Sequence, residues 1–138
     1  RIAREGHEIG NHTYSHRYLP LAPAASVERE LRATDRAIAD ATGQVPTLAR
    51  PPYGGRSPWT VRAFARLAKR LVLWDVNSFD WKGRPPREVA ARVLDRVRPG
   101  SIVLFHDTHA ERTITTLRML VPALRARGYA LGTVGQVA

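Results

Sequence analysis

The sequence predicts an α/β protein in which parallel strands alternate with helices. Apolar runs of strand length alternate along the chain with longer segments whose apolar residues recur every three or four positions. This alternation implies parallel strands joined by right-handed helical crossovers. The chain has 138 residues, of which 43% are hydrophobic, and that is enough for a single core. We therefore expect one domain over residues 1–138.

The first half of the chain is expected to form two helices separated by a strand. Ser26 is a typical N-cap and starts a helix that continues to about Thr42, where Gly43 ends it. A short strand over residues 47–49 follows and leads into a turn rich in proline and glycine. Ser57, followed by proline, caps the second helix. The apolar stripe of that helix is expected to be Val61, Phe64, Ala65 and Ala68.

The second half is expected to alternate strand and helix twice and to end on a strand. Its strands are apolar runs bounded by polar residues, and we expect them over residues 71–76, 101–105 and 129–134. Its helices are expected over residues 86–97 and 113–127. Ile114, Leu117, Val121 and Leu124 form the apolar stripe of the last helix. Pro122 lies inside this helix and should kink it or free one carbonyl.

The composition excludes several kinds of site. The absence of cysteine excludes disulfides, thiolate metal sites and a cysteine nucleophile. The formal net charge of +10 comes almost entirely from arginine, and most arginines are interspersed with acidic residues on the outward faces of the expected helices. A nucleic-acid-binding domain is an alternative that rests on charge alone, and we expect no nucleic-acid partner because aromatic and basic residues are not interleaved. No apolar run has membrane-spanning length.

Unusual polar residues follow the expected strands at their carboxyl ends. These residues are His12, His16, Arg50, Asp80 and His106. In parallel α/β folds, each strand delivers its exit loop to one common edge of the sheet, and binding and catalytic sites are built there. The sequence therefore predicts that four separate segments contribute to one site.

His12 and His16 have the spacing of a metal-ligand pair. Residues four apart point to the same side of a helix or a tight loop, and zinc commonly takes two histidines and a carboxylate. Asn11, Thr13 and Ser15 interleave the pair, and we expect their short polar side chains to hydrogen-bond the second ring nitrogens. A histidine pair on a solvated helix face is the alternative interpretation.

Four short motifs occur in one order along the chain. They are HTYSH at residues 12–16, RPPY at 50–53, DW at 80–81 and LFHD at 104–107. In this order they closely resemble motifs of the polysaccharide deacetylase family, the NodB-homology domains of carbohydrate esterase family 4. The resemblance covers essentially the whole chain. It implies a partial distorted (β/α) barrel of the NodB type, in which parallel strands alternate with helices and the first strands are missing.

The resemblance also implies an activity and a place of action. Family members are metal-dependent hydrolases that remove N- or O-acetyl groups from polysaccharides, so we expect an acetylated polymer such as peptidoglycan or a chitin-like N-acetylglucosamine polymer as substrate. Most such enzymes work outside the cytoplasm, which implies an extracellular or cell-envelope location. A non-catalytic carbohydrate-binding remnant of such an enzyme is the alternative.

The family motifs imply specific roles for catalytic residues of this chain. By resemblance, His12 and His16 bind a divalent metal, for which zinc is our expectation, and His106 is the general acid. Asp80 is expected to orient the ring of His106 and to stabilise its charged form. Arg50 is expected to position the catalytic base. Without the other motifs, Arg50 would be interpreted as a surface residue and His106 as a hydrogen-bonded histidine at the sheet edge.

A second set of residues is expected to bind the acetyl group and the sugar. By resemblance, the backbone N–H of Tyr53 completes the oxyanion site and Pro51 belongs to one wall of the groove. Trp74 and Leu104 are expected to line the pocket for the acetyl methyl, and Trp81 to lie in the same groove. A core position in a buried strand is the alternative for Trp74.

One family motif is not found in this sequence. The first motif, Thr-Phe-Asp-Asp, supplies the catalytic base and a metal-binding aspartate in the family. We therefore expect the chain to be an N-terminally truncated deacetylase whose third metal ligand lies upstream. Asp75 and Asp107 are alternative carboxylates, although Asp107 is more typical of a helix cap. His7 and His109 are expected to be structural or peripheral.

Overall fold

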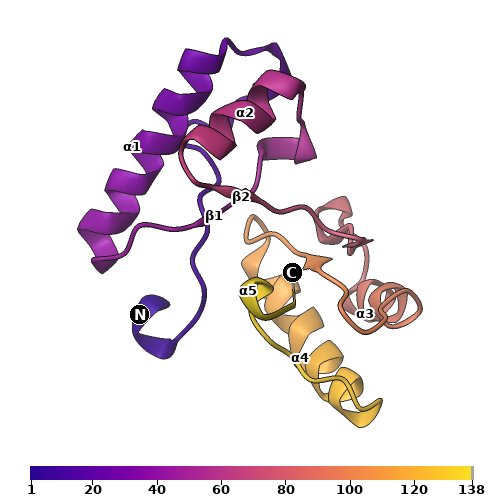
Figure 1. The fold of residues 1–138 in the computed structure, drawn as a ribbon. Coiled ribbons are helices and arrows are strands. Elements are labelled where there is room, and N and C mark those ends of the chain that lie inside the picture. Colours follow the sequence, from indigo (N-terminus) through magenta and orange to yellow (C-terminus); the bar gives the residue numbers. More distant parts are fainter. Residues whose placement is uncertain (138) are drawn as a thin grey trace. The chain divides into compact units, whose positions relative to one another are not determined.

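The computed structural model describes residues 1–137 and divides into two compact units, residues 1–73 and the chain from Trp74 onward (Figure 1). Both units combine helices with a pair of short parallel strands, which confirms the predicted α/β class. The single domain over residues 1–138 stays a prediction. Within residues 1–137, no helix has the length and apolar character needed to cross a membrane.

The first unit is built from two helices and two short parallel strands. These elements are α1 Ala24–Thr42, β1 Leu48–Ala49, α2 Pro58–Arg66 and β2 Arg70–Leu71. In the strand pair, Leu48 lies opposite Arg70 and Ala49 opposite Leu71. Asn11 forms a further parallel bridge with Ala49, so the segment before His12 is attached to β1.

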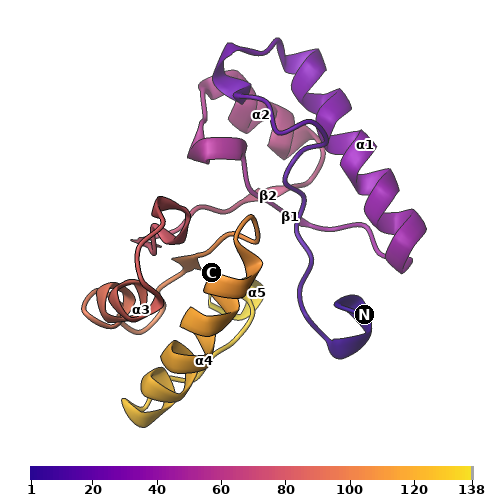
Figure 2. The ribbon, with the colours of Figure 1, turned by 180° about the vertical axis from the view of Figure 1, so that it is seen from behind.

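The core of the first unit lies between α1 and α2, which pack side by side in both ribbon views (Figures 1 and 2). Full burial of a Leu, Val or Phe side chain stabilises a fold by about 1.5–3 kcal/mol. The buried cluster consists of Leu19, Val27, Leu31, Ala49, Ala63 and Phe64. This cluster fixes α1 and α2 beside the strand that precedes Arg50.

The second unit packs two long helices over its own strand pair. Its elements are β3 Val76–Asn77, α3 Pro86–Leu94, β4 Val103–Leu104, α4 Ala110–Ala126 and α5 Val134–Val137. Val76 lies opposite Val103 and Asn77 opposite Leu104 in a parallel register. The buried cluster consists of Val76, Ala90, Val93, Leu120 and Leu124.

Two helix starts differ from the prediction. α1 begins at Ala24 with Pro23 at the N-cap position, so Ser26 lies inside the first turn and does not cap the helix. Alanine favours helix and the fixed φ of proline suits a helix start, so the helix extends past the predicted cap. α4 begins at Ala110 and continues through Pro122, whose missing N–H leaves one carbonyl of the preceding turn without its helical donor.

The buried faces of α2 and α4 are also rotated from the predicted ones. Val61 and Ile114 are exposed, whereas Thr60 and Thr116 are buried. The hydroxyl of Thr60 pairs with Ser57 Oγ at 2.8 Å, and that of Thr116 donates to a carbonyl of its own helix at 2.9 Å. Because these hydroxyls are satisfied locally, threonine can take core positions that the apolar pattern assigned elsewhere.

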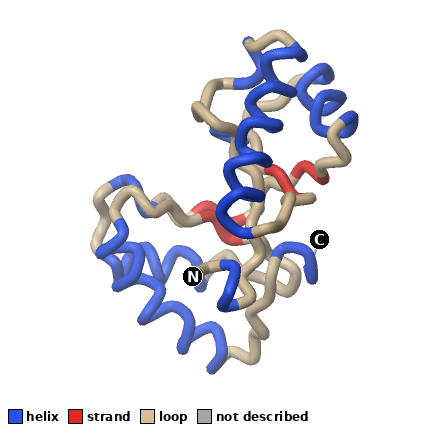
Figure 3. Tube along the Cα trace, turned by 90° about the vertical axis from the view of Figure 1, so that its left-hand side faces the viewer, coloured by secondary structure: helices blue, strands red, loops and turns tan. Residues whose placement is uncertain are grey.

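The predicted strands are shorter than expected, as Figure 3 shows in red. The apolar run 71–76 contributes Leu71 to the first strand pair and Val76 to the second, with no strand between them. The predicted final strand over residues 129–134 is wrong: no strand forms there, and Val134 begins α5. A strand requires hydrogen bonds from a neighbour, and the N–H of Tyr129 instead donates to Leu124 O at the end of α4.

Candidate functional site

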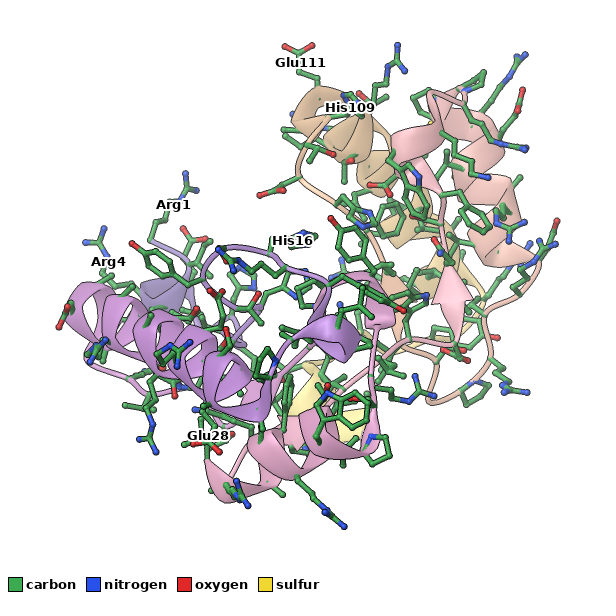
Figure 4. The ribbon with its side chains drawn as sticks, turned by 90° about the horizontal axis from the view of Figure 1, so that it is seen from above. Arg1, Arg4, His16, Glu28, His109 and Glu111 are labelled. Carbon is green, nitrogen blue, oxygen red and sulfur yellow. The ribbon has the colours of Figure 1, made fainter. Side chains whose placement is uncertain are left out.

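The predicted site residues fall into two groups, one in each unit. Their exposure differs widely: His12 and His16 are exposed, whereas Asp80 is buried. The first unit holds His12, His16, Arg50, Pro51 and Tyr53, and the second holds Trp74, Asp80, Trp81, Leu104 and His106. Figure 4 shows His16 on the loop that precedes α1.

His12 and His16 lie on a loop, and their rings are in contact. The ring centroids are 4.9 Å apart with the planes 76° to each other, and the Tyr53 ring contacts His16 at 4.8 Å. The loop is attached to β1, since Asn11 N–H donates to Leu48 O and Arg50 N–H donates to Asn11 O, both at 2.8 Å. The two imidazoles therefore share one exposed surface.

The Nδ1 atom of His12 is hydrogen-bonded to the main chain. Nδ1 of His12 lies 2.7 Å from the carbonyl oxygen of Arg50. A carbonyl only accepts, so Nδ1 carries the hydrogen and Nε2 carries the lone pair in the neutral ring. This tautomer is the one in which His12 can bind a metal through Nε2.

Asn11, Thr13 and Ser15 were predicted to hydrogen-bond the histidine rings, but the structure gives them other hydrogen-bonding environments. Asn11 instead bonds the backbone of its own loop and α1, and Ser15 Oγ donates to Glu30 Oε1 at 2.8 Å. The hydroxyl of Thr13 is buried and has no hydrogen-bond partner among the described residues. The expectation that these side chains fix the His12 tautomer was wrong, because the Arg50 carbonyl takes that position.

The imidazole pair fits part of a divalent metal site. Two neutral imidazoles on one exposed loop are suitable nitrogen donors, and the His12 tautomer is set for binding. No group of three or more His, Cys, Asp or Glu side chains that could hold a metal is found within residues 1–137. The pair therefore offers two nitrogen ligands, and a metal site here would need at least one more.

Asp75 and Asp107, the alternative carboxylates, both lie in the second unit. Asp75 Oδ2 accepts from Ser101 Oγ and Oδ1 from Ile102 N–H, each at 2.8 Å. Asp75 thus ties the start of β3 to the residues before β4. Asp107 is exposed and does not cap α4, because the N-cap position belongs to His109, where Figure 4 labels it.

Arg50 and Tyr53 lie in a rigid turn after β1. Arg50 is half-buried and donates from Nη2 to Leu73 O at 3.1 Å, and burial lowers the pKa of its guanidinium from the ordinary value. Pro51 and Pro52 are fully buried. Tyr53 has a left-handed backbone with φ of 59°, which is strained for a residue with a side chain. Such strain is typical of functional turns.

Asp80 holds the His106 ring in the second unit. Its side chain is only 5% exposed and accepts four hydrogen bonds. Two come from His106, from Nδ1 at 2.9 Å and from the backbone N–H at 2.7 Å, and the others come from the hydroxyls of Ser78 and Thr113 at 3.1 and 3.2 Å. Burial raises the pKa of Asp80, but the hydrogen bonds from His106 and Ser78 outweigh it and hold the pKa below its ordinary value. Asp80 is therefore a charged acceptor.

The hydrogen bond to Asp80 fixes the tautomer of the His106 ring. Because Asp80 accepts the Nδ1 hydrogen, the lone pair of the neutral ring is on Nε2. The side chain is 37% exposed, and the Trp81 ring contacts it edge-on with centroids 4.8 Å apart. Leu104 is buried in β4, and Trp74 is partly buried.

Sequence reasoning missed several residues that support these groups. Ser78 and Thr113 complete the hydrogen bonding of Asp80, and Glu30 on α1 binds the histidine loop. Ser78 lies two residues before Asp80, a spacing at which short side chains commonly bond the backbone, so it could have been recognised. Thr113 and Glu30 act across 33 and 15 residues of sequence, and helical periodicity carries no signal for such contacts.

Comparison with known proteins gives the family. A model of the polysaccharide deacetylase family matches residues 1–72. Over 99% of its length, the chain is 31% identical to a peptidoglycan-N-acetylglucosamine deacetylase of Listeria monocytogenes and 34% identical to a chitooligosaccharide deacetylase of Bradyrhizobium. The chain spans 28% of the first relative and 69% of the second.

Two solved structures share the fold over 99% of the chain. The T48 deacetylase solved with substrate is 40% identical with a TM-score of 0.90, and the chain covers 67% of it. A CE4 family pseudoenzyme from Bacillus anthracis is 29% identical with a TM-score of 0.93, and the chain covers 48% of it. These similarities confirm the predicted partial fold of the NodB type. The chain belongs to the polysaccharide deacetylase family.

Proposed function

We propose that this chain is part of a metal-dependent hydrolase that removes acetyl groups from a polysaccharide. The substrate class is an N-acetylglucosamine polymer such as peptidoglycan or a chitin-like chain, because relatives are named for both. The bond cleaved is then a carbon–nitrogen bond that is not a peptide bond. The observation that carries the proposal is the His106 ring, which a buried charged aspartate holds at Nδ1 and which therefore has the lone pair of its neutral form on Nε2.

In this proposal, the residues of the first unit bind the acetyl group. His12 and His16 hold a divalent metal, with zinc proposed because imidazole suits it. A metal bound there supplies Lewis-acid chemistry, polarising the acetyl carbonyl and lowering the pKa of a water molecule. The backbone N–H of Tyr53 donates to the oxygen that becomes negative, since the buried prolines beside it hold the turn.

In the same proposal, His106 and Asp80 of the second unit protonate the departing amine. His106 gives the proton on Nε2 to the departing amine, and Asp80 stabilises the charged ring from Nδ1. Trp74, Trp81 and Leu104 are proposed to exclude water around the acetyl group. Arg50 is proposed to position the base, and its fixed guanidinium suits that role.

The base and the third metal ligand are not assigned to any residue of this chain. The printed sequence contains no Thr-Phe-Asp-Asp segment, and we propose that both carboxylates come from outside these 138 residues. A cell-envelope or extracellular location is part of the same proposal, because the proposed substrates are wall polymers.

The experiment is acetate release from N-acetylglucosamine oligomers by the complete protein. The variants are His106→Asn and His12→Ala/His16→Ala, with His109→Asn as the matched control because His109 is exposed at the start of α4. We expect His106→Asn to lose at least about 100-fold of the rate, since general acid catalysis is worth that much. The double histidine variant should lose the contribution of the metal, and the control should keep wild-type activity. Equal rates for His106→Asn and His109→Asn would contradict the proposal.

A non-catalytic carbohydrate-binding protein is the second candidate. It is favoured by the similarity to the Bacillus anthracis pseudoenzyme and by three exposed rings around the histidine loop: Tyr14, Tyr18 and Tyr53. Such rings can stack on sugar faces. Binding of N-acetylglucosamine oligomers without any acetate release, in wild type and His106→Asn alike, would support this candidate over the deacetylase.

A further inference from the structure

The loop that carries His12 and His16 has an unfavourable backbone. Thr13 and His16 adopt positive φ angles of 65° and 54°. For a β-branched residue such as Thr13 this conformation is a genuine outlier, and it persists only where surrounding contacts enforce it. The loop therefore requires a structural support that is strong enough to hold two strained residues, one of which is the proposed ligand His16.

Glu30 on α1 supplies one such support. Its Oε2 accepts from Tyr14 N–H at 3.0 Å and from Ser15 N–H at 2.7 Å, and its Oε1 accepts from Ser15 Oγ at 2.8 Å. One carboxylate thus binds three donors at the middle of the loop, between His12 and His16. Burial raises the pKa of Glu30, but the hydrogen bonds from Ser15 and Tyr14 outweigh it and lower the pKa, so the carboxylate is charged at neutral pH.

Asn11 connects the start of the loop to the same helix. It is 1% exposed, and its Nδ2 donates to Leu31 O and to Asp35 Oδ1, both at 2.8 Å. Its Oδ1 accepts from the strained Thr13 N–H at 2.9 Å. Asp35 is in turn paired with the buried Lys69 at 2.7 Å. All hydrogen-bonding positions of the Asn11 amide nitrogen are therefore used to fix the loop against α1.

We propose that α1 presets the metal-binding loop, with Glu30 and Asn11 as positioning residues that hold His12 and His16 as a pair before any metal binds. The inference rests on the proposed function, because it takes the two histidines as metal ligands. The hydrogen bonds of Glu30 and Asn11 described above go to residues other than the two histidines. Their effect is that the loop need not be ordered when a metal binds, which raises affinity without adding a ligand.

The test is zinc binding to the complete protein carrying Glu30→Gln, because the third ligand is proposed to lie outside these 138 residues. Glutamine has nearly the same shape, but its amide group offers one acceptor oxygen where the carboxylate offers two. The matched control is Glu28→Gln, since Glu28 lies one half-turn earlier on α1 and pairs with Arg66 on α2 at 3.3 Å, away from the loop. Figure 4 labels Glu28 and His16, which lie on different sides of α1.

The main measurement is the zinc affinity, obtained by titrating zinc and monitoring the NMR signals of both histidine rings. We expect Glu30→Gln to bind zinc about tenfold more weakly, as is usual for groups that orient ligands from outside the first coordination sphere, and Glu28→Gln to bind like wild type. The metal-free proteins give a second measurement. In Glu30→Gln the Ser15 amide should exchange faster and the His12 ring should populate the Nε2–H tautomer, whereas both stay unchanged in Glu28→Gln.

The outcomes separate this inference from the proposed function. Zinc binding that is lost in His12→Ala/His16→Ala but unchanged in Glu30→Gln overturns the positioning role and leaves the metal role intact. Faster Ser15 exchange with unchanged zinc affinity overturns it as well. Zinc binding that survives in the double histidine variant overturns the metal role itself. A thermal midpoint equal in both glutamine variants excludes general destabilisation as the cause of weaker binding.

Discussion

His12 and His106 differ in the group that holds the inner nitrogen of each ring. Nδ1 of His12 faces the neutral carbonyl of Arg50 at 2.7 Å, and Nδ1 of His106 faces the charged carboxylate of Asp80 at 2.9 Å. Both arrangements leave the lone pair on Nε2. A carbonyl fixes the neutral ring, which is the form that binds a metal, whereas a carboxylate also stabilises the charged ring, which is the form that donates a proton.

The two regions also differ in how directly a carboxylate contacts the histidine-bearing segment. Asp80 contacts the His106 ring itself, with its charge satisfied by four donors. Asp35 is paired with Lys69 and contacts Asn11, which precedes His12. The comparison teaches that a carboxylate can hold a histidine ring directly, as Asp80 does, or hold a histidine-bearing loop through another residue, as Asp35 does through Asn11.

Asp80→Asn is expected to have the largest effect. The variant keeps the shape of the side chain but replaces one buried acceptor oxygen with an NH2 group that faces N–H and O–H donors, so we expect a loss of roughly 4 kcal/mol in the free energy of unfolding. The measurement is urea unfolding, with Asp95→Asn as control because Asp95 is exposed at the end of α3. Equal losses in the two variants would show that Asp80 is not a structural centre of the second unit.

Lys69→Met should destabilise the first unit somewhat less. The Lys69 side chain is 3% exposed, and its ammonium group contacts Asp35 Oδ2 and Pro46 O. Removing it leaves a largely buried carboxylate without its cation, which costs roughly 3 kcal/mol. Arg62→Met, on the exposed face of α2, is the control in the same urea experiment.

A second variant sharpens this prediction. Lys69→Met/Asp35→Leu removes both charges, so it should recover part of the stability lost in Lys69→Met. Recovery should be incomplete because Asn11 Nδ2 then loses the Asp35 oxygen. If the double variant loses more unfolding free energy than the two single variants added together, the two charges do not stabilise each other.

Part of the site could be predicted because its residues follow closely after strands that are recognisable in the sequence. His106 lies two residues after the end of β4 and Asp80 three residues after the end of β3, so the parallel pairing of these two strands brings their exit loops together. The contact between Asp80 and His106 follows from that topology. The catalytic role of each residue stays a prediction.

Other features depend on contacts that a periodic pattern does not encode. The face of α2 was misjudged because Thr60 is buried through a hydroxyl pair with Ser57, which hydrophobicity does not register. The hydrogen bonds between Glu30 and residues 14 and 15 form only because α1 packs beside the loop. In the sequence, Glu30 has the pattern of a solvent-exposed helix residue. The absence of a strand at 129–134 depends on the lack of a neighbouring strand within the described chain.

Asp75 gives the smallest predicted effect and tests whether a more exposed carboxylate behaves like Asp80. Burial raises the pKa of Asp75, but hydrogen bonds from Ser101 and Ile102 outweigh it and lower the pKa below its ordinary value. A lowered pKa means that the stabilisation is fully present above about pH 4 and is lost as the pH falls through the folded-state pKa. The difference in unfolding free energy between wild type and Asp75→Asn should therefore be constant from pH 7 to pH 5 and shrink below pH 4. If the difference in unfolding free energy persists unchanged at pH 2, Asp75 stabilises the fold through its shape and through neutral hydrogen bonds. A stabilising charge would then be expected only at the buried Asp80.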